Sequence, residues 1–198
     1  RVAMEHFEEH LASVEANKKK ETTDVVMDVE PTTESIAELT DRNSEWRKEL
    51  RASMKAKDRG NIERVKMPEL DPVYRATTRT EEVNIGLTKE MALTEAKRCL
   101  DCPKPTCVEG CPVNINIPSF IKNIERGQFL AAAKVLKNTS ALPAVCGRVC
   151  PQEKQCESKC IQLKMNKPAV AIGYLERFAA DYERQSGNIS VPEKEAAN

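Results

Sequence analysis

Eight cysteines, all between Cys99 and Cys160, carry the chemistry that this sequence offers. They form two blocks, with the spacings Cys99-x2-Cys102-x4-Cys107-x3-Cys111 and Cys146-x3-Cys150-x5-Cys156-x3-Cys160. Three thiolates within about ten residues let one loop hold three corners of a cuboidal iron–sulfur cluster. A further cysteine that precedes proline, as in Cys111-Pro112, is typical of a ligand to a neighbouring cluster. The pattern therefore predicts a site for two clusters.

The same spacing logic divides the donors into two sets. Cluster one is predicted to bind four thiols, namely Cys99, Cys102, Cys107 and Cys160. Cluster two is predicted to bind Cys111, Cys150 and Cys156, and its fourth ligand is either Cys146 or Glu176. Glu176 lies on the helix expected after Pro168, at the edge of the apolar face. A carboxylate there is either a hydrogen-bonded boundary residue or a metal ligand.

Other interpretations of the reactive residues fit less well. Structural zinc favours short cysteine pairs around one tetrahedral ion, which the x4 and x5 gaps do not provide. Disulfides require an oxidising compartment, and cysteine makes up about 4% of the chain, below the roughly 8–10% of disulfide-rich scaffolds. His6-Phe-Glu-Glu-His10 matches an H-x-x-E-H protease pattern, but it lies on an expected terminal helix without an enclosing core.

Composition excludes several classes of protein. The chain has 198 residues with 31 Lys+Arg and 31 Asp+Glu, so it lacks the basic excess of a nucleic-acid binder. It has neither an apolar run of about 18 residues nor a signal segment, which favours the cytoplasm, and no G-x-G-x-x-G loop. Aromatic residues make up only 4% of the chain, so its apolar core is expected to be small and a bound metal is expected to help stabilise the fold. Because the chain begins at Arg1, we expect it to be part of a longer protein.

The elements that must position the cysteines are all expected to be helices. An amphipathic helix is predicted over 33–58, with Trp46 as a packing anchor, followed by an irregular segment over 59–86 that wraps over other structure. Thr88 is expected to cap a helix over 89–98. Further helices are predicted from Pro118 to about 127, over 128–137, and from Pro168 to about 185. No stretch alternates as a strand does, so the prediction is an all-α, α-helical ferredoxin-like domain with irregular cysteine loops.

Four regions follow from this organisation. They are a terminal tail or linker (1–31), a helix plus an extended segment (32–86), a two-cluster domain (87–186) and a linker to a further domain (187–198).

Several motifs resemble a known family over about residues 75–185. They are Arg98-Cys-Leu-Asp-Cys102, Cys107-Val-Glu-Gly-Cys-Pro112, Ile117-Pro118, Gly147-Arg-Val-Cys-Pro151 and the segment from Pro168 to Phe178. They are similar to the N-terminal two-[4Fe-4S] domain of the NADPH-dependent glutamate synthase small subunit, which also occurs in dihydropyrimidine dehydrogenase and in the large subunit of NADH-dependent ferredoxin:NADP oxidoreductase. The resemblance implies that Glu176 is the fourth ligand of cluster two and that Cys146 is a bystander.

The resemblance also implies a function. The domain would relay electrons within an NAD(P)H-dependent flavin oxidoreductase, and the FAD and nicotinamide sites would lie in a Rossmann module outside this chain. A ferredoxin–NADP-reductase-type subunit or the glutamate synthase large subunit would be the further partner, and the chain alone would not be catalytic. The alternative is a structural or docking module that bound clusters or zinc hold together and that has no role in electron transfer. For cluster tuning, the amides of Gly110 and Gly147 are candidate donors to sulfur, and Arg148 is a candidate positive charge.

Overall fold

The structure is a computed structural model, and it describes residues 32–189. Within these residues every regular element is a helix, and the only pairing of extended chain is one antiparallel bridge between Glu69 and Asn84. The prediction of an all-α fold is thus confirmed. The residues expected to form a helix over 1–16, the His6–His10 pattern and most of the 187–198 linker lie outside the described part. The four region boundaries stay a prediction.

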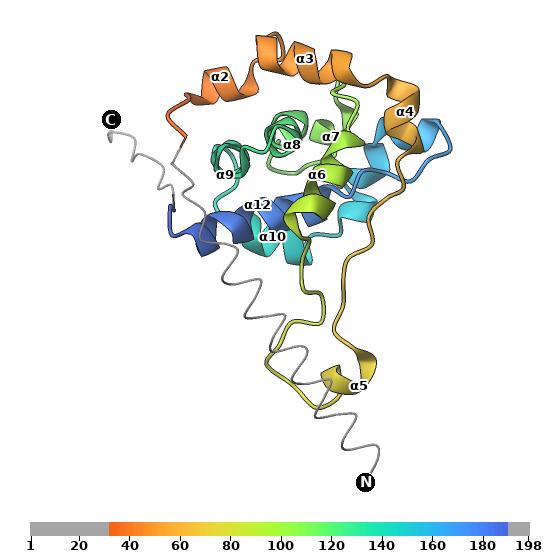
Figure 1. Cartoon of the computed structure of the whole chain (residues 1–198), viewed down its shortest axis with the longest axis vertical. Helices are drawn as coiled ribbons and strands as arrows, with labels where there is room; N and C mark the ends of the chain where they lie inside the picture. Colours follow the sequence, from red (N-terminus) through yellow and green to blue (C-terminus); the bar gives the residue numbers. More distant parts are fainter. Residues whose placement is uncertain (1–31, 190–198) are drawn as a thin grey trace.

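The core lies where α12 (Ile172–Ser186) packs against four other helices (Figure 1). These are α6 (Lys89–Lys97), α8 (Ile117–Glu125), α9 (Phe129–Lys137) and α10 (Pro143–Val149). Ile172, Leu175, Phe178 and Tyr182 recur every three or four residues and are all buried. The rings of Phe129 and Tyr182 meet edge to face with centroids 4.9 Å apart, so a few aromatic residues fill the centre.

The starts of these helices follow local sequence signals. The Thr88 hydroxyl accepts a hydrogen bond from the Met91 amide at 3.3 Å and caps α6 as predicted. Pro118 lies in the first turn of α8, one residue after its start. The predicted start at Pro168 is wrong, because α12 begins only at Ile172. The four preceding residues stay outside the helix, and the carbonyl oxygens of Pro168 and Ala169 accept hydrogen bonds from Arg98.

The single helix predicted over 33–58 is also wrong. The segment forms α2 (Ile36–Thr40), α3 (Glu45–Ser53) and α4 (Ala56–Asn61). Asp41 breaks it after α2, because its carboxylate accepts from the Asn43 amide and its carbonyl from the Ser44 hydroxyl, which closes a turn. Trp46 packs beneath Arg126, whose guanidinium lies 4.1 Å from the ring centroid, in keeping with an anchor.

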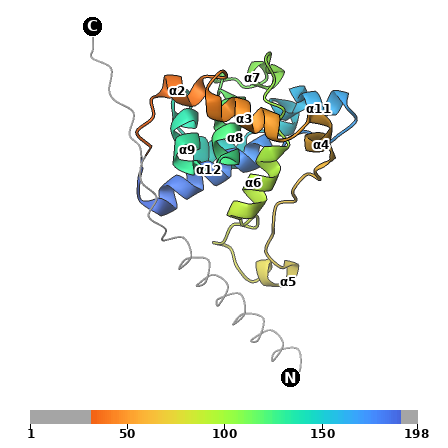
Figure 2. The same cartoon turned by 45° about the horizontal axis from the view of Figure 1, so that its top comes forward.

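Residues 62–88 are mostly irregular, as predicted, but their middle does not wrap over the rest. Figures 1 and 2 show that the chain leaves the body toward α5 (Pro72–Arg75) and returns to α6. The returning segment is fixed to the body by Glu82, which pairs with Arg148 and Arg177. No helix in residues 32–189 is long and apolar enough to cross a membrane.

The cysteine segments contain more helix than expected. Short helices missed by the sequence analysis are α7 (Thr106–Glu109), α10, α11 (Ile161–Lys164) and two 3₁₀ turns, η1 (Gln152–Lys154) and η2 (Glu157–Lys159). Each has seven residues or fewer, too few for a helical period to stand out in the sequence.

Candidate functional site

The four thiols assigned to cluster one surround a common cavity. Cys99 follows α6, Cys102 lies in the next loop, Cys107 lies in α7 and Cys160 follows η2. Apolar side chains complete the wall, among them Ile117, Ile121, Val170 and Ile172. Chain segments about 60 residues apart thus meet at one water-poor space.

Burial dominates the chemistry of this thiol group. It raises the pKa of Cys99 to about 11. The pKa of Cys107 is raised further, by burial first and then by the neighbouring Cys99 and Cys160. Several buried thiolates side by side are unfavourable unless a bound cation compensates their charge. The group is therefore suited to hold a positively charged metal centre.

A second donor group forms where α10 and α12 meet the 150–160 segment. Burial first, and then the charges of Cys146, Glu176 and Cys111, raise the pKa of Cys150 to about 11. Burial likewise raises the pKa of Cys156 to about 12, with contributions from Glu157, Cys111 and Glu176. These interactions place all five candidate donors of cluster two in one neighbourhood.

Glu176 is the unusual member of this second group. Its side chain is only 5% exposed, and within residues 32–189 its Oε1 atom has no hydrogen-bond partner. Burial raises its pKa to about 7. An orphaned carboxylate oxygen is costly in a protein interior unless it binds a cation. By contrast, Cys146 receives a hydrogen bond from the Ser140 hydroxyl, with 4.0 Å between Oγ and Sγ.

Two glycines allow the close approaches that assemble the second group. A Cβ atom on Gly147 would lie 2.6 Å from the Arg177 nitrogen, so α10 reaches α12 only because this side chain is missing. A Cβ atom on Gly110 would lie 2.8 Å from the Gln155 carbonyl oxygen and 3.1 Å from Cys156 Cα. Gly110 thus brings Cys111 next to Cys156. Its amide donates to the Thr106 carbonyl at 3.2 Å, and its role as a donor to sulfur stays a prediction.

Arg148, considered above as a positive charge near the cluster, forms ion pairs with acidic side chains. Its guanidinium donates to both carboxylate oxygens of Asp181, at 3.0 and 2.8 Å, and to Glu82 at 2.9 Å. Arg177 pairs with the same Glu82 at 2.5 Å. Arg148 is therefore neutralised in an ion-pair network that joins α10, α12 and the 76–88 segment.

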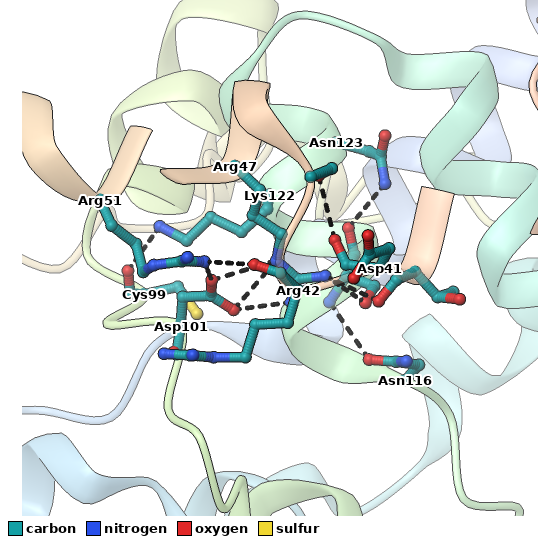
Figure 3. Close-up of polar contacts among 12 residues, drawn as sticks. Asp41, Arg42, Arg47, Arg51, Cys99, Asp101, Asn116, Lys122 and Asn123 are labelled. Atoms are coloured by element: carbon teal, nitrogen blue, oxygen red, sulfur yellow. Dashed lines mark hydrogen bonds and ion pairs between the residues drawn. The ribbon is translucent and has the colours of Figure 1, made fainter. Parts of the chain in front are cut away.

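A buried ionic cluster beside the first thiol group, shown in Figure 3, was not predicted from the sequence. Asp101, between Cys99 and Cys102, accepts hydrogen bonds from Arg47 and Arg51, and Lys122 donates to the Cys99 carbonyl at 2.7 Å. Burial alone would raise the pKa of Asp101, but these arginines lower it overall. A backbone hydrogen bond from Asp101 in turn lowers the pKa of Cys99. The sequence feature that could have indicated this cluster is an acidic residue inside a Cys-x2-Cys turn, together with arginines at 42, 47 and 51.

The donors that are present fit a positively charged cluster. All eight cysteines are free thiols, and four of them line one cavity. In the second group, the Oε1 atom of Glu176 is buried without a hydrogen-bond partner among the described residues.

Comparison with known proteins agrees with this chemistry. The sequence model of the family described as dihydropyrimidine dehydrogenase domain II, 4Fe-4S cluster, matches residues 75–188. The chain is 39% identical over 107 residues to the NAD-dependent dihydropyrimidine dehydrogenase subunit PreT of Escherichia coli (strain K12), covering 54% of this chain and 26% of that protein. It is 37% identical over 114 residues to the glutamate synthase [NADPH] small chain of Halomonas elongata, covering 58% of this chain and 24% of that protein. The chain thus spans about a quarter of the length of these relatives.

Proposed function

The chain belongs to the family of the dihydropyrimidine dehydrogenase domain II, 4Fe-4S cluster, and we propose that residues 87–186 form a domain that relays electrons through two such clusters. The resemblance noted from the motifs is thereby confirmed at the level of the family. A bound [4Fe-4S] cluster supplies a one-electron redox centre. The chain's own residues hold the clusters, orient them and exclude water.

The ligand assignment is supported by the way the donors divide, with four thiols around one cavity and five candidate donors in a second group. We assign Cys99, Cys102, Cys107 and Cys160 to cluster one, and Cys111, Cys150, Cys156 and Glu176 to cluster two. The observation that carries this proposal is the cavity lined by four thiols from two distant sequence blocks. The orphaned Oε1 of Glu176 supports its place in the second set.

The two ligand sets give the clusters different properties. A carboxylate is a harder ligand than a thiolate, so Glu176 gives cluster two a reduction potential different from that of cluster one. The apolar wall of Ile117, Ile121 and Ile172 keeps water from cluster one. Cys107 lies in the first turn of α7 and Cys111 two residues after its end, and the charge of Cys156 acts on Cys107, which supports a short path between the clusters.

The remaining parts of the reaction are proposed to lie outside this chain. Reduced NAD(P)H would reduce FAD in a Rossmann module of the parent protein, and the flavin would exchange single electrons with the clusters. A ferredoxin–NADP-reductase-type subunit or a glutamate synthase large subunit is the proposed further partner. Eight free thiols are best kept in a reducing compartment, which supports a cytoplasmic location.

Iron analysis combined with reduction tests this function. Anaerobically prepared chain is expected to be brown and to carry about eight irons and eight inorganic sulfides, because each cluster holds four of each. Dithionite is expected to bleach its broad absorption near 400 nm. A colourless zinc protein would contradict the proposal, and a brown protein that dithionite does not reduce would favour a purely structural role.

A further inference from the structure

The segment formed by α2, α3 and α4 is here called the N-terminal arm, residues 32–61. It lies outside the residues that match the family, 75–188. Figures 1 and 2 show it crossing the body above α8 and α9, and α2 packs against both helices. The arm therefore contributes to this domain something that the family match does not include.

The arm delivers three arginines to the turn that holds Cys99 and Cys102 (Figure 3). Arg47 binds Asp101 through two nitrogens, with Nη2 2.6 Å from Oδ1 and Nε 3.0 Å from Oδ2. Arg51 Nη1 lies 2.6 Å from Oδ2 of the same carboxylate. Arg42 Nη2 donates to the Asp101 carbonyl at 3.0 Å. Asp101 has a φ of 52°, a strained value for a residue other than glycine, so the contacts hold an unfavourable turn in place.

These contacts leave an excess of positive charge beside cluster one. Three guanidinium groups meet one carboxylate, because Arg42 bonds a neutral carbonyl and Arg47 uses its remaining donor on Ser119 and the Thr40 carbonyl. This charge lies close to the ligands, because the carboxylate and carbonyl that the arginines contact belong to Asp101, the residue directly before Cys102.

Among the described residues, the surroundings of cluster two lack such an excess of positive charge. Glu157, the residue after Cys156, is paired with a single arginine, Arg64, at 2.8 Å. Arg148 and Arg177 on α10 and α12 are already engaged by Glu82 and Asp181. Cluster two thus has no cationic excess comparable to that of Arg42, Arg47 and Arg51 in the described residues.

We propose that the N-terminal arm is an electrostatic positioning element that raises the reduction potential of cluster one above that of cluster two, so that a single electron rests on cluster one. The inference deepens the proposed function and rests on it. Adding an electron makes a cluster more negative, and nearby unneutralised cations stabilise that form. The arginines act through the Asp101 turn and its field and do not bind iron.

A redox titration of the iron-loaded chain, followed by electron paramagnetic resonance, tests this role. Arg51→Gln removes a cation that is 23% exposed, and Lys48→Gln removes one that is 51% exposed on the same helix. Arg51→Gln is expected to shift the reduction equilibrium of cluster one about tenfold toward the oxidised form, which is about 59 mV for one electron. Lys48→Gln is expected to leave it unchanged, and Arg51→Lys is expected to restore most of the original potential.

Each reduction step is assigned to a cluster by a separate substitution. The step that moves in Glu176→Gln belongs to cluster two, and the other step should move in Arg51→Gln. If Arg51→Gln loses iron, Arg42→Gln provides the same comparison, because it removes a cation while leaving the Arg47–Asp101 pair.

Two results would overturn the inference. They are an unchanged cluster-one potential in both arginine variants, and equal shifts in Arg51→Gln and Lys48→Gln. Neither result would affect the proposed function. That function fails only if the unsubstituted chain lacks two reducible clusters.

Discussion

At the scale of single residues, the main question is which side chain completes cluster two. Cys146 and Glu176 both lie beside Cys150, and a thiolate is the usual ligand to iron–sulfur clusters. The hydrogen bonds separate them, because Cys146 has a partner in Ser140, whereas Oε1 of Glu176 is buried without one in the described residues. The cost of that buried oxygen is explained if it binds iron.

Substitution of each candidate separates the two assignments. Glu176→Ala is expected to reduce the iron content from about eight to about four per chain, because cluster two loses a ligand. Cys146→Ser is expected to retain about eight irons with unchanged spectra. Iron and sulfide analysis of both variants, prepared under the same anaerobic conditions, makes the comparison. Loss of iron in Cys146→Ser with retention in Glu176→Ala would reverse the assignment.

At the scale of elements, the close contact of α10 with α12 positions the second donor group. Gly147 lies against the backbone of Arg177. Gly147 directly follows Cys146 in the chain, and Arg177 directly follows Glu176, so this contact brings the two candidate ligands together. Because glycine has no side chain at this contact, α10 and α12 can approach closely enough to bring their donors together. A similar contact at Gly110 holds α7 against the segment before Cys156.

An added methyl group should therefore force α10 away from α12. Gly147→Ala is expected to destabilise the holoprotein by about 1–3 kcal/mol, the usual cost of overpacking, despite the better helix propensity of alanine. It should also weaken iron retention at cluster two more than at cluster one. Val145→Ala, an exposed change on the same helix, is the control and should cost little. Equal stability of Gly147→Ala and the parent in urea unfolding would contradict this account.

Glu95, in α6, links the end of its own helix to two distant segments through one buried carboxylate. Its oxygens accept from Arg98 at 2.6 Å, from the Val65 amide at 2.8 Å and from the Ala171 amide at 2.8 Å. Glu95→Gln leaves the Arg98 guanidinium buried without its anion, and we expect a loss of about 3–5 kcal/mol in unfolding free energy. Glu90→Gln, at an exposed position of the same helix, should change it by less than about 0.5 kcal/mol. Similar unfolding midpoints for both variants would show that the Glu95 contacts are not needed.

Local signals explain which elements could be predicted from the sequence. The Thr88 cap, the helix after Gln128 and the apolar face of α12 depend on neighbouring residues, so spacing reveals them. The delayed start of α12 depends on Arg98, about 70 residues away, and the break near Asp41 depends on a turn whose residues are also tolerated in helices. Likewise, the spacing of the cysteines indicates the two donor groups, whereas the arginines around Asp101 meet it only through tertiary packing.

At the scale of the whole molecule, the fold combines one apolar core with two groups of proposed cluster ligands. The core of α8, α9 and α12 contains Phe120, Phe129 and Leu175 and has its own aromatic contacts. The segments around Cys107 and Cys156 consist of short helices and 3₁₀ turns that carry donors of both groups. Stability should therefore differ between these parts.

Removal of iron is expected to loosen these parts unequally. Chelation under reducing conditions should greatly speed amide exchange in α7 and over 150–164, because metal binding stabilises the segments that supply the ligands. Exchange in α8 and α9 should remain slow. Hydrogen exchange with mass spectrometry before and after chelation reports both regions in one experiment. Uniform loss of protection would show that the apolar core does not persist without the clusters.

The central claim is that two neighbouring [4Fe-4S] clusters form one relay, and electron paramagnetic resonance of the fully reduced chain tests it most directly. The shared α7 segment between Cys107 and Cys111 requires the clusters to lie close together. Full reduction is therefore expected to give two unpaired spins per chain with a spectrum broadened and split by their magnetic interaction, whereas half reduction should give one simple signal. A fully reduced spectrum of one spin per chain, or of two spins without interaction, would contradict the relay.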